Sequence, residues 1–419
     1  MTARYWTCAL VCLLRLPAFA APGDYPPELP PLDQVRSAIG DSPEVRAAVA
    51  MRQAGLAERR QFVSGPHEWS TRVDHQRRRA DGVPRVERFS EWEVALERAL
   101  RLPDKTRLDR LLGEQRVAET TAALAEARHE AARRLLALWY QWMREQAAAD
   151  VLRNQAALSG RELAGIARRE QLGDASHLDA LQAQAAAAQA EGSARLADER
   201  AKRAEILLRQ QFPQITALVG PAPPAPMPPG NDLAVLGESA LQQDHALRLA
   251  RTAAQRGRLE SERADAERRP DPTVGVRYGS ERGGSERVIG VYVSIPFGGE
   301  ARRAAADASR ARAEALDQLA EARLRRLNGE VRSLQSAVDS SVLRWRVAEQ
   351  SAELQARVAE RLAAANQLGE TGIAAVLLAR RQSLEASLLE RNARVDSLEN
   401  LALLLLEAHR LWDFDSEAD

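Results

Sequence analysis

The chain contains the same pattern twice. Gln171-Leu172-Gly173-Asp174 is followed by a helical run rich in small residues, and Gln367-Leu368-Gly369-Glu370 is followed by another. A proline-free stretch precedes each copy, and before it come two β-like segments closed by a proline. The copies are roughly 195 residues apart, too far for a solenoid repeat and suited to a duplicated domain. The sequence therefore predicts a unit of helix, strand pair, very long helix, turn and helix, made twice.

Composition narrows the class of protein. The 419 residues include 59 Lys+Arg and 59 Asp+Glu, so the net charge is zero, which argues against a nucleic-acid partner. Aromatic residues make up only 4%, and Ala, Leu, Arg, Glu and Gln dominate, as is typical of long helices. The sequence has no Gly-rich phosphate loop, nucleophile elbow or HExxH motif. We therefore expect neither an enzyme nor a bound cofactor.

Residues 1–20 have the pattern of a secretory signal peptide, with a positively charged start, an apolar core and a small-x-small cleavage site. Both cysteines, Cys8 and Cys12, lie in this segment, so the mature chain should contain no disulfide and no cysteine ligand. Beyond it, the longest strongly apolar run is 401–406, far short of the ~18–20 residues of a spanning helix. An exported chain of this kind is either soluble in the periplasm or enters a membrane as β-barrel strands.

Proline and glycine divide the rest of the chain into two repeats. The expected segments are a Pro-rich leader at 21–31, a first repeat at 32–212, a Pro-rich linker at 213–231, a second repeat at 232–412 and a tail at 413–419. The expected strands are at about 67–77 and 86–100 in the first repeat and about 272–280 and 287–296 in the second, with turns at about 172–178 and 368–374.

The strand pairs alternate in polarity, so each should have one apolar face. The apolar residues of the second pair are Val274, Val276, Tyr278, Ile289, Val291, Val293 and Ile295, and those of the first pair include Trp69, Val73, Trp92 and Val94. The first pair is rich in glutamate, which makes its pattern less regular.

The proline-free stretches predict very long helices. A continuous helix over 104–172 would be about 100 Å long at ~1.5 Å per residue. Such a helix needs partners along its whole length. Its narrow stripes of Ala and Leu, such as Leu124, Ala131 and Leu138, favour helix–helix contact on two sides.

This order of elements resembles the TolC-like outer-membrane efflux family. Residues 272–276 and 290–299 look like the family's second membrane hairpin and its turn into the long helix. Residues 172–183 look like the family's periplasmic tip, and 368–379 look like its second copy. The segment 91–105 resembles the corresponding segment of the CzcC-like heavy-metal branch of the family.

The resemblance implies a fold that is mainly α with a small β part. It implies a homotrimer in which each chain gives four strands to one twelve-stranded β-barrel, with the apolar strand residues facing lipid, while the helices form a tube across the periplasm. Four strands cannot close a barrel and lipid does not tolerate an open sheet edge, so three copies agree with the physics.

The implied function is a passive duct in the outer membrane that docks to a periplasmic adaptor and an inner-membrane RND-type pump, and exports heavy-metal cations. The alternatives are a duct for drug efflux or type I secretion, and a soluble periplasmic coiled-coil scaffold. The scaffold explains the long helices but not two symmetrically placed alternating hairpins.

Two kinds of site follow from the resemblance. The adaptor is expected to dock at the tips, at Leu172, Gly173, Asp174, Leu368, Gly369 and Glu370. Asp179 is expected to form a charged ring at the periplasmic aperture. The alternative is that Asp179 is a helix-start acid favoured by the helix dipole. The second copy has Ala375 and Leu378 at the corresponding places, so no second acidic ring is expected.

The six histidines show no ligand spacing along the sequence, and we expect no metal site. They are His67, His75, His129, His177, His245 and His409. His67 and His75 lie near one hairpin, where contact with a passing cation is the alternative to a surface role. His177 is the histidine that lies in a tip motif.

Overall fold

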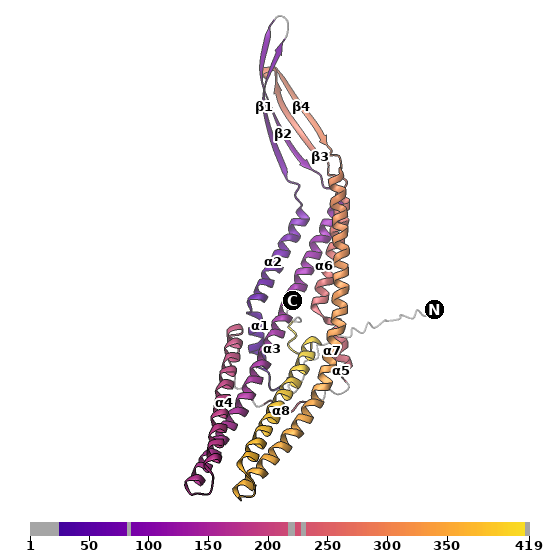
Figure 1. Ribbon diagram of the computed structural model, residues 1–419. Coiled ribbons are helices and arrows are strands. Elements are labelled where there is room, and N and C mark those ends of the chain that lie inside the picture. Colours follow the sequence, from indigo (N-terminus) through magenta and orange to yellow (C-terminus); the bar gives the residue numbers. More distant parts are fainter. Residues whose placement is uncertain (1–24, 82–84, 217–222, 228–231, 415–419) are drawn as a thin grey trace, which may run out of the picture.

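The computed structural model describes residues 25–81, 85–216, 223–227 and 232–414. The molecule is elongated, with a small sheet at one end and two helical hairpin tips at the other (Figure 1). The expected signal peptide at 1–20 lies outside the described residues. Within these residues, no helix combines the length and apolar character that crossing a membrane requires.

Each half of the chain has a helical segment, a β-hairpin, a long helix and a shorter return helix. The elements of the first half are α1 (Leu32–Gly40), α2 (Pro43–Ser64), β1 (Trp69–Asp81), β2 (Val86–Ala99), α3 (Pro103–Gln171) and α4 (His177–Gln211). Those of the second half are α5 (Leu233–Gln243), α6 (His245–Ala266), β3 (Thr273–Glu281), the 3-10 turn η2 (Arg282–Gly284), β4 (Glu286–Ser294), α7 (Glu300–Gln367) and α8 (Ile373–Glu407).

The long helices α3 and α7 have 69 and 68 residues. Pro103 occupies the first turn of α3, where its missing N–H removes no helical hydrogen bond. Each long helix packs against its return helix, α3 against α4 and α7 against α8. The first pair meets through small side chains, Ala149 on α3 and Ala197 and Ala201 on α4, so the two backbones approach closely.

The two hairpins form one antiparallel sheet in the order β1-β2-β3-β4 (Figure 1). Its register pairs Val73 with Val94, Val94 with Tyr278 and Tyr278 with Ile289. Strand β1 continues to Asp81, past the expected end near residue 77. The arginines at 77–79 therefore lie within the strand, and Arg78 Nε is 3.3 Å from a carboxylate oxygen of Glu91.

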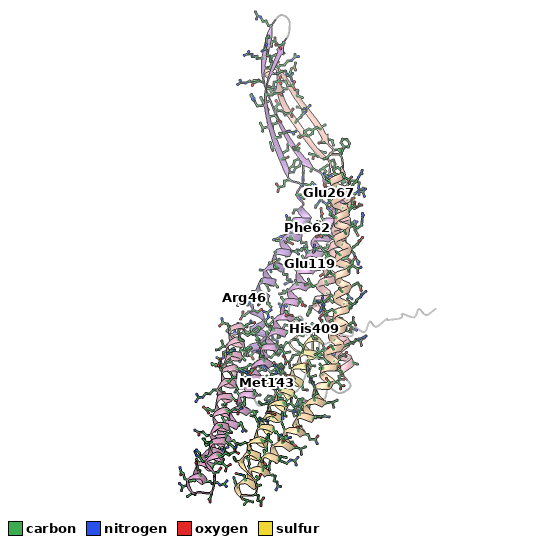
Figure 2. The ribbon with its side chains drawn as sticks, in the orientation of Figure 1. Arg46, Phe62, Glu119, Met143, Glu267 and His409 are labelled. Carbon is green, nitrogen blue, oxygen red and sulfur yellow. The ribbon has the colours of Figure 1, made fainter. Side chains whose placement is uncertain are left out.

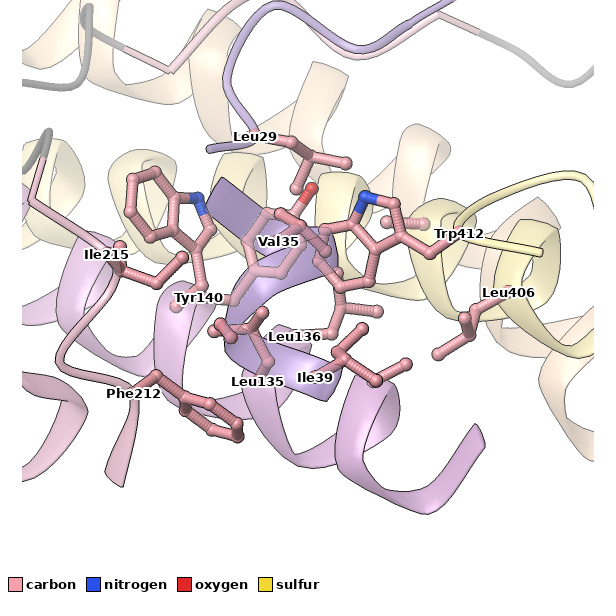
Figure 3. Packing of buried hydrophobic residues seen from close by; sticks show 14 of the residues in the cluster. Leu29, Val35, Ile39, Leu135, Leu136, Tyr140, Phe212, Ile215, Leu406 and Trp412 are labelled. Atoms are coloured by element: carbon pink, nitrogen blue, oxygen red, sulfur yellow. The ribbon is translucent and has the colours of Figure 1, made fainter. Parts of the chain in front are cut away.

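The main hydrophobic core lies in the middle of the molecule, where segments from both ends of the described chain meet α3 (Figure 3). Val35 and Ile39 of α1 pack with Tyr140 of α3 and with Trp412. The Trp139 indole N–H donates to the Glu28 carbonyl at 3.0 Å. The described part of the leader is thus fastened to the centre of α3.

Candidate membrane sheet and docking tips

The apolar side chains of the four strands share one continuous face of the sheet. Because cross-strand partners point to the same side, the register places Val73 and Val94 on the face that carries Tyr278 and Val291. This face is open: Ile289 and Val291 are 82% and 83% exposed. The other predicted lipid-facing residues of β3 and β4 have the same alternation, and Ile295 follows one residue after the end of β4.

The opposite face of the sheet is polar and cross-linked by charge. Arg72 donates to the Tyr292 hydroxyl at 3.2 Å, and that hydroxyl donates to Glu97. Arg277 on β3 donates to Glu93 on β2 at 3.3 Å. One face therefore suits an apolar medium and the other suits water.

Aromatic rings lie on the apolar face. Trp92 and Tyr278 meet edge-to-face with ring centroids 5.7 Å apart. Trp69, at the start of β1, lies 5.5 Å beneath the Arg98 guanidinium. An exposed tryptophan at the end of an apolar strand is typical of the boundary between lipid and water.

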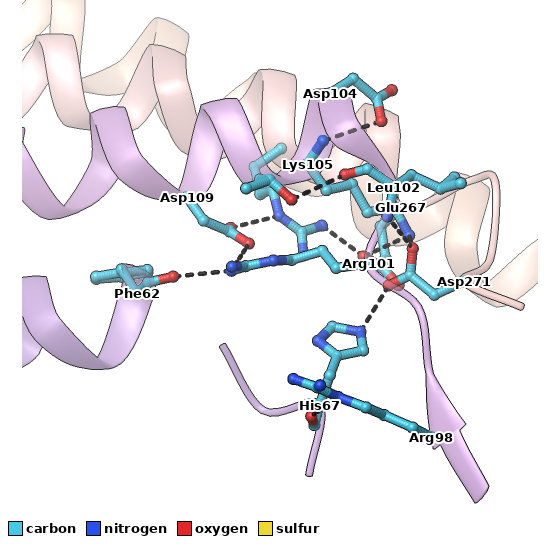
Figure 4. Close-up of polar contacts among 12 residues, drawn as sticks. Phe62, His67, Arg98, Arg101, Leu102, Asp104, Lys105, Asp109, Glu267 and Asp271 are labelled. Atoms are coloured by element: carbon cyan, nitrogen blue, oxygen red, sulfur yellow. Dashed lines mark hydrogen bonds and ion pairs between the residues drawn. The ribbon is translucent and has the colours of Figure 1, made fainter. Parts of the chain in front are cut away.

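A buried charge network joins the sheet to the helices (Figure 4). The fully buried Lys105 side chain lies 3.0 Å from Asp271 Oδ1 and 3.2 Å from Glu267 Oε2. Asp271 also accepts the Leu102 N–H at 3.1 Å and lies 3.0 Å from His67 Nε2. These contacts connect the segments that enter and leave both hairpins.

The same network fixes the ionisation of Asp271. Burial opposes the charged form, but hydrogen bonds from the Lys105 ammonium, the Leu102 N–H and His67 outweigh it and hold the pKa of the Asp271 carboxyl below its usual value. The pKa of Glu267 is likewise lowered, since hydrogen bonds from Arg263 and Lys105 outweigh its burial. Both carboxylates remain charged at neutral pH.

The first tip ends α3 with a Schellman motif. Gly173 has φ +83°, a left-handed conformation that favours glycine. Its N–H donates to the Glu170 carbonyl at 3.0 Å, and the Asp174 N–H donates to the Arg169 carbonyl at 2.8 Å. Leu172 is left 64% exposed.

The second tip repeats this geometry at the end of α7. Gly369 has φ +77°, its N–H donates to Asn366 at 3.1 Å, and the Glu370 N–H donates to Ala365 at 2.9 Å. Leu368 is 75% exposed. The positive φ of both turns favours glycine, and each turn leaves a leucine exposed to solvent.

The tips differ in the helix that follows. In the first, Ser176 and Asp179 form a capping box: the Asp179 N–H donates to Ser176 Oγ at 3.1 Å, and Asp179 Oδ2 accepts the Ser176 N–H at 3.2 Å. In the second, α8 begins after Gly372 with no side-chain cap. Asp179 thus has the helix-start role that the sequence left open, and whether it also lines an aperture remains a prediction.

The two tips lie side by side. Ile166 of α3 and Ala183 of α4 cluster with Ile373 and Val376 of α8. Arg380 of α8 donates to Glu162 of α3 at 2.9 Å. The exposed leucines are therefore presented together at one end of the molecule (Figure 1).

The structure gives three of the histidines local partners. His67 lies against Asp271, His75 lies 3.0 Å from the Ser90 hydroxyl, and His177 lies 2.7 Å from Glu170 in the first tip. The other three, which the sequence did not connect, come together in the middle of the molecule. Their positions 129, 245 and 409 are too far apart along the chain for any spacing rule to link them.

No protein-family model matches this chain, and no curated protein sequence matches it. Solved structures do. VceC, an outer membrane protein of Vibrio cholerae, aligns with a TM-score of 0.73 and 15% identity over 90% of this chain and 95% of that chain. The CmeC outer membrane channel of Campylobacter jejuni aligns with a TM-score of 0.73 and 13% identity over 92% and 86%. CusC, a protein that forms a transmembrane channel, aligns with a TM-score of 0.62 and 12% identity over 90% of this chain and 91% of that chain.

The chain has the fold of outer-membrane channel proteins. The similarity covers 90% or more of this chain and 86% or more of each of these three structures. The fold predicted from the duplicated motifs, mainly helical with a small antiparallel sheet, is confirmed.

Proposed function

We propose that the chain is the outer-membrane component of a tripartite efflux system and acts as a passive duct, not as an enzyme. The observation that carries this proposal is the continuous, exposed apolar face of a four-stranded sheet mounted on helices about 100 Å long at ~1.5 Å per residue. A soluble periplasmic scaffold does not need an exposed apolar face. An apolar patch of this kind is typical of a surface that contacts a membrane or another protein.

We propose that three copies close one barrel. Strands β1 and β4 are the edges of the sheet, and their outward backbone groups need partners in lipid. Pairing β4 of one copy with β1 of the next satisfies them, and three copies supply twelve strands. The polar face then lines the interior, where its charges meet water.

The helices support the same assembly. Exposed apolar residues Leu343, Val347 and Leu354 are four and seven residues apart on α7, so they form one stripe. Leu196 and Leu207 are similarly exposed on α4. In a ring of copies, the stripe of α7 would pack on α4 of its neighbour, which would cover both.

At the opposite end, Leu172 and Leu368, with their glycines and the acids Asp174 and Glu370, form a surface suited to the hairpin tips of a periplasmic adaptor, which in turn binds an RND-type inner-membrane pump. We propose heavy-metal cations as the exported substrate, on the resemblance of residues 91–105 to the CzcC-like branch. The alternatives are a duct for drug efflux and a duct for type I secretion.

We propose that Asp179 also lines the narrow mouth of the duct. Because its carboxylate caps α4, the variant must keep a cap, and Asp179→Asn removes the charge while keeping an acceptor oxygen. In reconstituted bilayers, Asp179→Asn should lower cation selectivity and weaken block by multivalent cations at the periplasmic side. An unchanged reversal potential with unchanged block would leave Asp179 as a capping residue alone.

The experiment that tests the proposed function is fractionation of the exporting cell followed by detergent extraction. The mature protein should remain in the outer membrane after alkaline washing and should migrate as a trimer. Leu172→Ser with Leu368→Ser should keep the trimer and abolish efflux, whereas Leu389→Ser, a change of another exposed leucine on α8, should retain efflux. Recovery of a soluble monomer would contradict the proposal.

A further inference from the structure

Three histidines from distant parts of the chain converge in the middle of the molecule. His129 lies on α3, His245 begins α6, and His409 follows α8 (Figure 2 labels His409). One ring nitrogen from each lies within 4.8 Å of the other two. The ring centroids are 5.5, 5.4 and 4.6 Å apart.

The cluster is buried. The side chains of His129 and His409 are 9% and 8% exposed, and residue His245 is 3% exposed. Leu406, Trp412 and others enclose a cavity of about 10 Å³ at the three rings. This is about the space that a single water-sized sphere occupies, so the cavity suits one small ion.

Two of the rings lie beside carboxylates. His129 Nε2 lies 3.2 Å from Glu407 Oε2. His409 Nδ1 faces Asp413 at 3.8 Å, while its Nε2 is buried without a hydrogen-bond partner. A carboxylate hydrogen-bonded to one ring nitrogen, as Glu407 is to His129, is a usual arrangement for histidines that bind a metal, because it fixes the ring and the tautomer.

His409 has a left-handed backbone conformation that is less favourable for histidine than for the glycines at the same position of the two tips. The His409 N–H donates to Leu406 and the Arg410 N–H donates to Leu405, which is the same Schellman motif as in the two tips. The tips place glycine at the left-handed position, but here a histidine has φ +56°. Glycine would adopt this conformation with less strain, so we infer that the imidazole side chain has a role of its own.

We propose that His129, His245 and His409 form a binding site for a borderline divalent transition cation of the zinc type. Imidazole is a favoured ligand for Zn²⁺, Ni²⁺ and Cu²⁺. Tetrahedral binding at Zn–N distances of about 2.0–2.1 Å needs ligand nitrogens about 3.4 Å apart, so a modest inward movement of the rings brings three of the four ligands into range and leaves the fourth position to a water. Two carboxylates lie beside the rings: Glu407, which also pairs with Arg133 at 2.8 Å, and Asp413.

Burial makes this ion a resident of the fold and not cargo in transit. It would fasten the segment after α8 to α3 and to the start of α6, close to where Ser239 already donates to the Ala408 carbonyl at 3.0 Å. The site lies within one chain, and it depends neither on the proposed channel nor on its substrate.

The test uses the purified, detergent-solubilised protein, stripped with a chelator and titrated with Zn²⁺ alone. We expect one bound ion per chain, an increase in melting temperature on binding, and an intense visible spectrum typical of tetrahedral coordination when Co²⁺ replaces Zn²⁺. Failure of the wild-type protein to bind Zn²⁺ after stripping would overturn the proposal.

The key variant is His409→Asn, since asparagine tolerates the left-handed conformation and keeps the turn. It should abolish the bound ion and the cobalt spectrum and should melt at the same temperature with and without Zn²⁺. Glu407→Gln should weaken binding by about 10–100-fold. The matched control is His177→Asn, which removes an exposed histidine that also faces a glutamate.

If His177→Asn loses the ion as His409→Asn does, or if His409→Asn binds normally, the buried site is wrong. A second variant, His409→Gly, removes the imidazole and keeps the left-handed turn, so it should show no rise in melting temperature on addition of Zn²⁺. A rise equal to that of the wild type would overturn the proposal.

Discussion

The first and second halves of the chain follow the same plan but are supported differently. The strands of the first hairpin have 13 and 14 residues, and those of the second have 9 each. The first tip is held by a capping box, and the second has none. Both tips nevertheless keep a left-handed glycine and an exposed leucine. What the halves share is the surface that they present, and what differs is the local support behind it.

The largest expected effect on assembly comes from placing charge on the apolar face of either hairpin, since every copy in the proposed trimer would carry that charge. Val73→Arg in the first half and Val291→Arg in the second should both prevent assembly in the outer membrane, because a charge near the bilayer midplane costs about 2–4 kcal/mol. The trimer yield after outer-membrane extraction measures this.

Asp74→Arg is the matched control, since Asp74 is next to Val73 and points to the polar face. It should assemble. If Val73→Arg is tolerated while Val291→Arg is not, the two hairpins do not share one lipid-facing surface.

The next effect concerns the network that joins the halves. Lys105→Met would leave the buried Asp271 carboxylate without its ammonium, whereas the half-exposed Glu267 keeps Arg263 and Arg302 as partners. The loss at Asp271 should lower the free energy of unfolding by about 3 kcal/mol. Urea unfolding of the purified protein measures it. The control Arg195→Met, which breaks an exposed pair with Glu191, should cost no more than about 0.5 kcal/mol.

This network also predicts a pH dependence. Because the pKa values of Asp271 and Glu267 are lowered in the folded state, their contribution is fully present above their unfolded values of 3.8 and 4.5 and is lost as pH falls through the folded values. Wild-type stability should therefore decrease below about pH 4.5, and the Lys105→Met variant should lose less on acidification. If the wild type and the Lys105→Met variant lose the same stability on acidification, these two carboxylates do not cause the pH dependence.

The duplicated fold was predictable because proline and glycine mark its boundaries and strand alternation marks the apolar face of its sheet. Residues such as Val291 and Tyr278 are set by a local period of two, which the sequence displays. The extension of β1 to Asp81 was missed because its arginines resemble a solvated loop, and only their pairing with carboxylates on β2 explains them. In the tips, positive φ explains why glycine occurs at 173 and 369, and the docking role that the resemblance implies for them stays a prediction.

The histidine cluster was not predictable from the sequence. His129, His245 and His409 lie on three elements that only the folded backbone brings together. A spacing rule detects ligands on one element or one turn, and these residues share neither. The left-handed histidine after α8 becomes visible as unusual only when its turn is compared with the two glycine turns of the tips.

The smallest expected effects separate the two tips. Ser176→Ala should destabilise the start of α4 by about 0.5–2 kcal/mol because it removes the cap, whereas Gly372→Ser should stabilise the start of α8 by a few tenths of a kcal/mol. Amide hydrogen exchange at each tip measures both. Equal responses of the two tips would contradict the difference in their support.

The central claim, that copies of this chain surround one duct, is tested most directly by cysteine cross-linking between α4 and α7. Leu196 and Val347 are both exposed and lie at matching heights, about 30 Å above their tips at ~1.5 Å per residue. Leu319, exposed on α7 about 70 Å above the tip, provides the mismatched control. Oxidation of Leu196→Cys with Val347→Cys in intact outer membranes should give a covalent trimer, and Leu196→Cys with Leu319→Cys should give none. Recovery of only monomers from the matched pair, or of trimers from both pairs, would contradict the account.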